Sequence, residues 1–335
     1  MAKPTRLVQA KEERFIPISP LMIFPEVCGD FNIYLKKGEH HLLFSARGEE
    51  FSQRHKITLY ENGVEEIYIA AAQEKSYLIY LEQNLGRILN DDGLPLEERS
   101  KIFHHSCTAS VKAAMQSKLP TVLDVVFFEN ILNVVRSSLS LLSARDGLKT
   151  IASLMSHDYR TYSHCVNVFI YAMSILETFG IDREEKLHYG LGAILHDIGK
   201  LRISPMVLNK PGNLTNAEWE LVKTHPVEGV GLCTRISLSQ AAINCILFHH
   251  EKYDGSGYPV GLAGENIPFP ARVTAVADVY DALTTKRVYG EARTPYEALM
   301  EMKGEMNQAF EPEILKRLVL VLSGAEIIKG GDGLV

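Results

Sequence analysis

Short strand-like patterns dominate the first 80 residues of the chain. Apolar and polar side chains alternate in FIPIS (15–19) and FNIYL (31–35), and VEEIYIA (64–70) has a similar strand-like pattern. A period of two residues is typical of half-buried β-strands. Between the last two runs, EEFSQRHKITLYENG (49–63) predicts a helix that ends at Gly63, a residue type suited to the position just after a helix. Residues 1–80 are therefore predicted to form a small α/β module with a regulatory or interaction role.

Helical patterns replace these strands from about residue 76. Apolar residues recur at spacings of three and four in 76–89, 96–118 and 121–144, which predicts helices. We interpret residues 81–146 either as a helical connector between two domains or as the first helices of the second domain. His104 and His105 lie on one of these predicted helices with no carboxylate motif nearby, and we interpret them as structural or exposed.

The stretch from 147 to 325 is predicted to be almost entirely helical. Thr215 with Glu218, and Thr294 with Glu297, form capping boxes that begin helices. The first of these helices is expected to run to about His225, since Pro226 follows. The fold class is therefore α+β, in which the small α/β module precedes an all-helical bundle domain, and residues 326–335 form a flexible tail.

Composition excludes several classes of protein. The chain has 335 residues, 46% hydrophobic and 23% charged, which is ordinary for a globular protein and atypical of a disordered one. Its net charge of −6 argues against a binder of nucleic acid polymers or of anionic membranes. No apolar run suggests a transmembrane helix or secretory signal. Five widely spaced cysteines without a CxxC motif are typical of reduced thiols, so a cytoplasmic location is expected.

Candidate metal ligands cluster in the second half of the chain. Seven of the twelve histidines lie between His157 and His250. Imidazole and carboxylate groups occur on or at the ends of predicted helices at five places: His164, His196–Asp197, His225, His249–His250 and Asp278. Both groups are ligands of first-row metals. A carboxylate between two sets of histidines can bridge two metal ions, which together favour in-line displacement at phosphorus.

A single histidine in a helical bundle is usually packed or solvated, so none of these side chains identifies a metal site by itself. The joint pattern is more informative, because His196–Asp197 and His249–His250 both follow apolar runs that draw them toward a core. Burying so many polar groups without partners is costly, and a shared metal centre removes that cost. His164 is predicted on an amphipathic helix. His157 and His188 lack such a context and are interpreted as structural.

The order of these residues resembles that of the HD-domain phosphohydrolase superfamily, and the flanking motifs are similar to those of the HD-GYP family. The resemblance covers about residues 150–322 and rests on five motifs in the same order: HDIGK (196–200), LNKPGNLT (208–215), THP (224–226), HHEKYDGSGYP (249–259) and ADVYDALT (277–284). It implies an all-helical catalytic domain that hydrolyses the bacterial second messenger cyclic di-GMP to linear pGpG, with further cleavage to GMP left open.

The resemblance also implies two divalent metal ions per chain. One would bind His164, His196, Asp197 and Asp278, and the other Asp197, His225, His249 and His250, with Asp197 as the bridge. Iron is placed first, with manganese and zinc as alternatives. Lys200 is expected beside the nucleophile or the scissile phosphate. Some family members bind a third metal through a Glu four residues before the first ligand, where this chain has Arg160, so two ions are predicted.

Substrate contacts are implied on the same basis. The GYP loop matches the family at Asp254, Gly257, Tyr258 and Pro259, although such a loop could also simply cap the bundle. Arg287 matches a phosphate-contacting Arg of the family pattern R-P-Y-R/K. Val288 and Gly290 depart from that pattern, which puts tight binding or high turnover in question, and Lys210 and Lys286 could compensate.

Two alternatives from the same residues stay open. The departures at Val288 and Gly290 favour a receptor or scaffold that hydrolyses little cyclic di-GMP. Such a protein would bind cyclic di-GMP itself, or it would bind a diguanylate cyclase through the GYP loop. An HD hydrolase acting on another nucleotide is the other alternative, and the GYP loop argues against it. A homodimer contact through helices in 97–143 is also compatible with the sequence.

Overall fold

The computed structural model describes residues 14–25, 27–91, 94–115, 125–142, 161–285 and 292–323. The chain divides into two compact units, Met1–Pro95 and Leu96–Val335. The helices expected over 81–146 are therefore shared between the units, since the first of them groups with the N-terminal sheet and the next two with the helical unit. Among the described residues, no helix combines the length and apolar character needed to cross a membrane.

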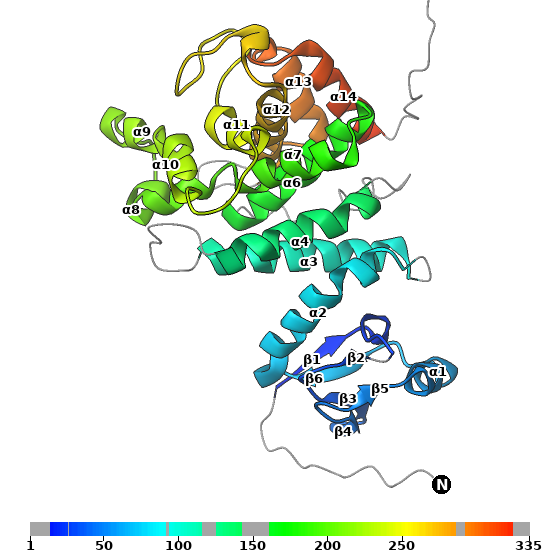
Figure 1. Ribbon diagram of the computed structural model, residues 1–335. Coiled ribbons are helices and arrows are strands. Elements are labelled where there is room, and N and C mark those ends of the chain that lie inside the picture. The colour runs from blue at the N-terminus through cyan, green and yellow to red at the C-terminus, as the bar shows by residue number, and fades with distance from the viewer. Residues whose placement is uncertain are drawn as a thin grey trace, which may run out of the picture. The chain divides into compact units, whose positions relative to one another are not determined.

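The N-terminal unit is built on an antiparallel sheet (Figure 1). Its four strands lie in the order β1 (Phe15–Ile18), β6 (Ile67–Ala70), β3 (Ile33–Lys37) and β4 (His40–Ser45), and a second ribbon pairs β2 (Val27–Cys28) with β5 (Glu50–Phe51). Ile67 and Ile69 are fully buried, as the alternating pattern of this strand requires. The three strands predicted from the sequence are all present, with shifts of one to three residues at their ends.

Two helices complete this unit. Helix α1 (Gln53–Glu61) begins at a capping box between Ser52 and His55. It is followed by Gly63 with a φ of +61°, the left-handed conformation that favours glycine after a helix. Helix α2 (Glu74–Leu89) follows β6 and a short 3₁₀ turn. The predicted α/β character of this part of the chain is confirmed.

Among the residues that the structure describes, the regular secondary structure of the second unit is all helical (Figure 1). Its helices are α3 (Leu96–Met115), α4 (Val125–Leu142), α6 (Thr161–Thr178), α7 (Arg183–Leu195), α8 (Pro205–Leu208), α9 (Asn216–Val222), α10 (His225–Leu232), α11 (Gln240–Phe248), α12 (Phe269–Thr284), α13 (Pro295–Lys303) and α14 (Pro312–Ser323). The predicted capping boxes begin α9 and α13, with Thr215 and Thr294 as their first residues.

Helix α6 lies at the centre of this unit, where it packs against α3, α7, α12 and α14. Every residue from 163 to 176 is buried. The expectation of an amphipathic helix around His164 is therefore wrong. A helix covered by neighbours on all sides has no solvent-facing stripe to fill with polar residues.

One helix boundary also differs from the sequence prediction. Helix α9 ends at Val222, and His225 begins α10 rather than ending the preceding helix. Pro226 explains the difference, because proline is well tolerated in the first turn of a helix, where its missing N–H leaves no hydrogen bond unmade. Pro226 therefore marks the start of a helix at this position.

Candidate metal centre

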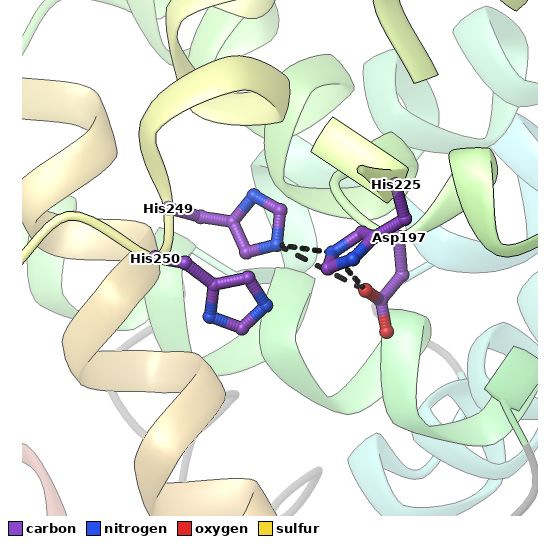
Figure 2. Close-up of side chains that lie close together, drawn as sticks. All are labelled: Asp197, His225, His249 and His250. Atoms are coloured by element: carbon purple, nitrogen blue, oxygen red, sulfur yellow. Dashed lines mark hydrogen bonds and ion pairs between the residues drawn. The ribbon is translucent and has the colours of Figure 1, made fainter. Parts of the chain in front are cut away.

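Five helical elements bring the predicted ligands together. His164 lies within α6, His196 and Asp197 follow the end of α7, His225 begins α10, His249 and His250 follow the end of α11, and Asp278 lies within α12. They form two groups: Asp197, His225, His249 and His250 in one, and His164, His196 and Asp278 in the other. In each group the candidate ligand atoms lie within 4.8 Å of one another. Figure 2 shows the first of these groups.

Asp197 lies between the two groups and faces both. Its Oδ2 is 3.5 Å from Nε2 of His164 and 3.5 Å from Nε2 of His196. Its Oδ1 is 3.2 Å from Nε2 of His225 and 3.9 Å from Nε2 of His249. One carboxylate oxygen therefore points to each group, which is the geometry that a bridging ligand needs.

Glycine explains how Asp197 and His225 come so close. Gly199, in the 3₁₀ turn Ile198–Arg202 (η3), lies directly against the backbone of His225 and Gly229. A Cβ atom at this position would overlap the His225 carbonyl oxygen. The glycine of the HDIGK motif therefore lets this turn contact α10, and this contact brings the carboxylate and the imidazole together.

The backbone orients three of the imidazoles. The Nδ1 atoms of His196 and His225 donate to carbonyl oxygens of Ala193 and Val222, at 2.7 Å each. His249 Nδ1 donates to the Ile246 carbonyl at 2.9 Å. In a neutral ring whose Nδ1 carries the proton, Nε2 has only a lone pair. All three lone pairs are therefore directed into the centre.

Unpaired acceptors at the centre fit a metal ion. The Nε2 atoms of His225 and His249 are 3.2 Å apart, so two lone pairs face each other. Within the described part of the chain, His196 Nε2 and Asp197 Oδ1 are buried without a hydrogen-bond partner. Buried acceptors that face one another are unfavourable unless a cation lies between them. The donor set of imidazole and carboxylate suits a divalent first-row metal, and we describe the cluster as a candidate divalent metal centre.

The charges of these groups support the same assignment. Burial by itself would raise the pKa of Asp197, but the charge of Lys200 opposes it, and the pKa lies well below its usual value. Asp278 behaves in the same way, because the adjacent His164 ring opposes the effect of burial on its pKa. Burial lowers the pKa of both His249 and His250. Ionised carboxylates and neutral imidazoles are the forms that bind metals.

A further carboxylate, which the sequence analysis did not single out, supports His164. Asp281 is 1% exposed and lies one turn after Asp278 on α12. Its Oδ2 is 2.7 Å from His164 Nδ1, while Asp278 Oδ1 lies 3.0 Å from Nε2 of the same ring. The spacing of three residues could have indicated this, because positions i and i+3 share one face of a helix.

The GYP loop lies against the second ligand pair. The Tyr258 ring stacks on His250, with ring centres 4.7 Å apart and planes at 29°. A Cβ atom on Gly257 would lie 2.6 Å from the His250 carbonyl oxygen, so only glycine allows this close approach. Burial raises the pKa of Tyr258, which keeps its hydroxyl protonated.

Glu251 anchors the residues that follow this loop, and the sequence analysis missed it as well. Glu251 is 2% exposed, and its carboxylate accepts hydrogen bonds from the backbone N–H groups of Val260, Gly261 and Leu262 at 2.7 to 3.1 Å. Glu251 directly follows His249–His250 in the chain. It therefore couples the end of the GYP loop to the ligand pair.

Of the remaining predicted site residues, Lys200 lies at the metal centre, while Lys210 and Asp254 have partners elsewhere. Lys200 Nζ is 2.5 Å from Asp197 Oδ2, inside the centre. Lys210 pairs with Glu218 of the α9 capping box at 2.6 Å, and Asp254 accepts from the backbone N–H and hydroxyl of Ser256 within its own loop. The other positions lie outside the described residues: His157, Arg160, Lys286, Arg287, Val288 and Gly290.

Histidines outside the centre differ in their surroundings. His188 is half-buried on α7, outside both ligand groups. His104 is also half-buried, and its Nε2 lies 3.4 Å from Asn167 Oδ1. The side chain of His105 lies outside the described part of the structure. The five cysteines are free thiols, four of them buried and Cys28 exposed.

Comparison with known proteins places these features in a family context. A family model described as HD domain matches residues 128–314. The chain is 37% identical over 185 residues to cyclic di-GMP phosphodiesterase PA4108 of Pseudomonas aeruginosa, which is 54% of this chain and 44% of that protein. It is 42% identical over 147 residues to the cyclic di-GMP phosphodiesterase response regulator RpfG of Xanthomonas campestris, 43% of this chain and 39% of that protein.

A third relative carries a different name. The 3′3′-cGAMP-specific phosphodiesterase 2 of Vibrio cholerae is 36% identical over 161 residues, covering 48% of this chain and 31% of that protein. The chain thus spans less than half the length of these curated relatives. Among solved structures, Bd1817, an HDG"Y"P protein from Bdellovibrio bacteriovorus, matches with a TM-score of 0.62 at 22% identity, over 92% of this chain and 100% of that chain. This likeness supports the fold.

Proposed function

The chain belongs to the HD domain family, and we propose that it is a metal-dependent phosphodiesterase that hydrolyses cyclic di-GMP to linear pGpG. The observation that carries the proposal is the position of Asp197, with one carboxylate oxygen toward each of two histidine groups. The names of two relatives as cyclic di-GMP phosphodiesterases support the choice of substrate. Whether pGpG is cut further to GMP is left to the product analysis.

We propose two divalent ions per chain, with iron first and manganese or zinc as alternatives that the same ligands accommodate. One ion would be held by His164, His196, Asp197 and Asp278, and the other by Asp197, His225, His249 and His250. Bound there, the metal pair would supply an acidified water and positive charge for in-line displacement at phosphorus. Elemental analysis of metal-replete protein should return two ions per chain, and a value of three would contradict the proposal.

The protein's own residues have distinct roles in this proposal. Lys200 keeps an ammonium group beside Asp197, where it would stabilise negative charge developing on the phosphate. Tyr258 would hold the substrate against the wall formed with His250. The other proposed substrate contacts are Asp254, Gly257, Lys210 and Arg287. Of these, Lys210 would have to leave Glu218 to reach a phosphate.

The test uses the purified full chain under reducing conditions. Metal-free protein is loaded in parallel with Fe(II), Mn(II) or Zn(II), and the metal content of each sample is measured before the assay. Incubation with cyclic di-GMP, followed by chromatography, is expected to show pGpG in at least one loaded sample and none in the metal-free sample. Verified metal occupancy without any linear product would overturn the proposal.

A substrate panel tests the choice of nucleotide. Because one relative is named for 3′3′-cGAMP, the panel should contain cyclic di-GMP, 3′3′-cGAMP, cyclic di-AMP and pGpG at equal concentrations. The proposal expects the highest kcat/KM for cyclic di-GMP. A higher kcat/KM for another nucleotide of the panel would support the proposed phosphodiesterase activity but assign it a different substrate.

The second candidate function is a receptor that binds cyclic di-GMP and turns it over slowly. The sequence departures at Val288 and Gly290 favour it, since one basic contact of the family pattern is missing. The single tryptophan, Trp219, offers a binding assay, because the residue is 47% exposed and its ring centre lies 6.3 Å from that of Tyr258. A saturable change in its fluorescence without product formation would favour the receptor over the enzyme.

A further inference from the structure

Asp281 holds the side of His164 that faces away from the other ligands. The His164 ring lies between two carboxylates of α12, with Asp278 at Nε2 and Asp281 at Nδ1. Asp281 belongs to neither candidate ligand group. Its Oδ1 accepts from Asn167 Nδ2 at 2.8 Å and from the Thr285 hydroxyl at 3.2 Å, in addition to the bond between Oδ2 and His164.

The chemistry of these groups determines the direction of each hydrogen bond. An ionised carboxylate only accepts, so His164 donates from Nδ1 to Asp281, and Asn167 must present its NH₂ group to Asp281. On the other side of the ring, Nε2 faces Asp278, which is itself a candidate ligand, and a bound metal would take the place of a proton there. The carbonyl oxygen of Asn167 then points the other way, toward His104 of α3, whose Nε2 lies 3.4 Å from it. That distance is near the upper limit for a hydrogen bond, so this last contact contributes least.

A carboxylate in this position has a specific effect on a ligand histidine. A proton kept on Nδ1 leaves the Nε2 lone pair for a metal, and the negative charge makes the ring a stronger base. Partners of this kind typically change metal affinity by about 10- to 100-fold. Burying a carboxylate merely to fill space would be costly, whereas the three donors around Asp281 make it favourable.

We propose that Asp281 is the positioning residue that sets the tautomer and ring orientation of His164 for metal binding, supported by Asn167 and, through it, by His104 of α3. The inference rests on the metal-binding part of the proposed function and requires no particular substrate. It also extends the support of the centre to α3, which lies before the stretch that carries the sequence motifs.

The decisive variant is Asp281→Asn, which keeps the size and shape of the side chain and removes its negative charge. Its side-chain amide can offer an oxygen to only one of two donors, so either His164 or Asn167 faces another N–H group. We expect metal affinity at the His164 group to fall about 10- to 100-fold. Equilibrium dialysis of the metal-free full chain against Mn(II) or Zn(II), followed by elemental analysis, measures affinity and stoichiometry without substrate. A folded variant with unchanged affinity and stoichiometry would overturn the inference.

A double variant separates charge from packing. Asp281→Asn combined with Asn167→Asp restores a complementary partner for every donor, but places a neutral acceptor at His164. We expect the double variant to recover the melting temperature of the metal-free protein while metal affinity stays low. Full recovery of both would overturn the inference, because Asp281 would then have a purely structural role. Thr285→Val serves as the matched control, since it removes one bond to Asp281 without changing the charge facing His164.

A measurement on the unaltered chain covers the case in which Asp281→Asn does not fold. In zinc-loaded protein labelled with ¹⁵N-histidine, NMR should show His164 with a proton on Nδ1 and the metal on Nε2. Coordination through Nδ1 would overturn the inference. Neither assay uses a nucleotide, so the two hypotheses can fail separately. Absence of hydrolysis would refute the proposed phosphodiesterase and leave this inference intact. Unchanged metal binding in Asp281→Asn would refute this inference and leave the proposed phosphodiesterase intact.

Discussion

His164 and the histidines at the helix ends are oriented in different ways. His196, His225 and His249 each donate Nδ1 to the carbonyl three residues earlier in their own segment. His164 donates instead to Asp281, a side chain 117 residues away. A backbone carbonyl is present whatever the neighbouring side chains are, whereas the support of His164 exists only when α6 packs against α12. The centre therefore has a locally supported part and a part supported by tertiary contacts.

The largest expected effect comes from the residue that both parts share. Asp197→Asn removes the charge that faces both histidine groups, and we expect loss of metal from both. Metal ions supply several kcal/mol of transition-state stabilisation, so the hydrolysis rate should fall on the order of 10³-fold or more. Metal content and initial rates with cyclic di-GMP measure this.

His188→Gln is the matched control for Asp197→Asn, because His188 lies half-buried on the helix that precedes Asp197 but outside both groups. It should keep normal metal content and rate. A full complement of metal and a near-normal rate in Asp197→Asn would show that Asp197 does not bridge the two groups.

His164→Leu and His249→Leu in metal-free protein test the difference between support by a distant carboxylate and support by a backbone carbonyl. The first leaves Asp281 as a buried charge without its imidazole partner, and should lower the free energy of unfolding by about 3–5 kcal/mol. The second removes the hydrogen bond from His249 Nδ1 to the Ile246 carbonyl, which costs about 0.5–1.5 kcal/mol. It also removes the repulsion between the facing lone pairs of His225 and His249.

Urea denaturation of both leucine variants beside the unaltered chain gives these values. The expected order is a larger loss for His164→Leu. Equal losses would mean that support by a distant carboxylate and support by a backbone carbonyl are energetically equivalent.

Glu251 extends the locally supported part to the GYP loop. Glu251→Gln replaces a charged acceptor of backbone N–H groups by a neutral amide, and should weaken the anchor by about 1.5–3 kcal/mol. We expect faster amide hydrogen exchange in 254–262 and a higher KM, with metal content unchanged. Glu265→Gln, an exposed glutamate nearby, is the control. Loss of metal in Glu251→Gln would instead assign Glu251 to the centre itself.

The smallest effect concerns thiol reactivity and compares the helical unit with the N-terminal one. Burial raises the pKa of Cys233 and Cys245 to about 12, and the pKa values of Cys107 and Cys165 are raised as well. At pH 8 these four should therefore remain protonated, while Cys28 is exposed. Maleimide labelling of native protein should modify Cys28 alone, and denatured protein should take up label at all five cysteines. Rapid labelling of a second native thiol would indicate that the helical unit opens.

Sequence patterns predicted much of this molecule. Strands at Phe15–Ile18 and Ile67–Ala70 and the capping boxes at Thr215 and Thr294 follow from local rules, and the structure contains them. The helix end before Pro226 was predicted wrongly, because a proline both interrupts one helix and suits the start of the next. The amphipathic interpretation of α6 failed because its burial depends on neighbours that a local pattern does not reveal.

The sequence by itself determined which residues could form the centre, because the imidazoles and carboxylates occur in motifs with a specific order along the chain. Only the tertiary structure decided how they are used. It directs the two oxygens of Asp197 toward different groups, places Asp281 behind His164, and ties Glu251 to the backbone of Val260–Leu262. These contacts join residues that are separated along the chain or that face each other across a loop, and hydrogen bonds depend on direction and distance that spacing in a sequence does not encode.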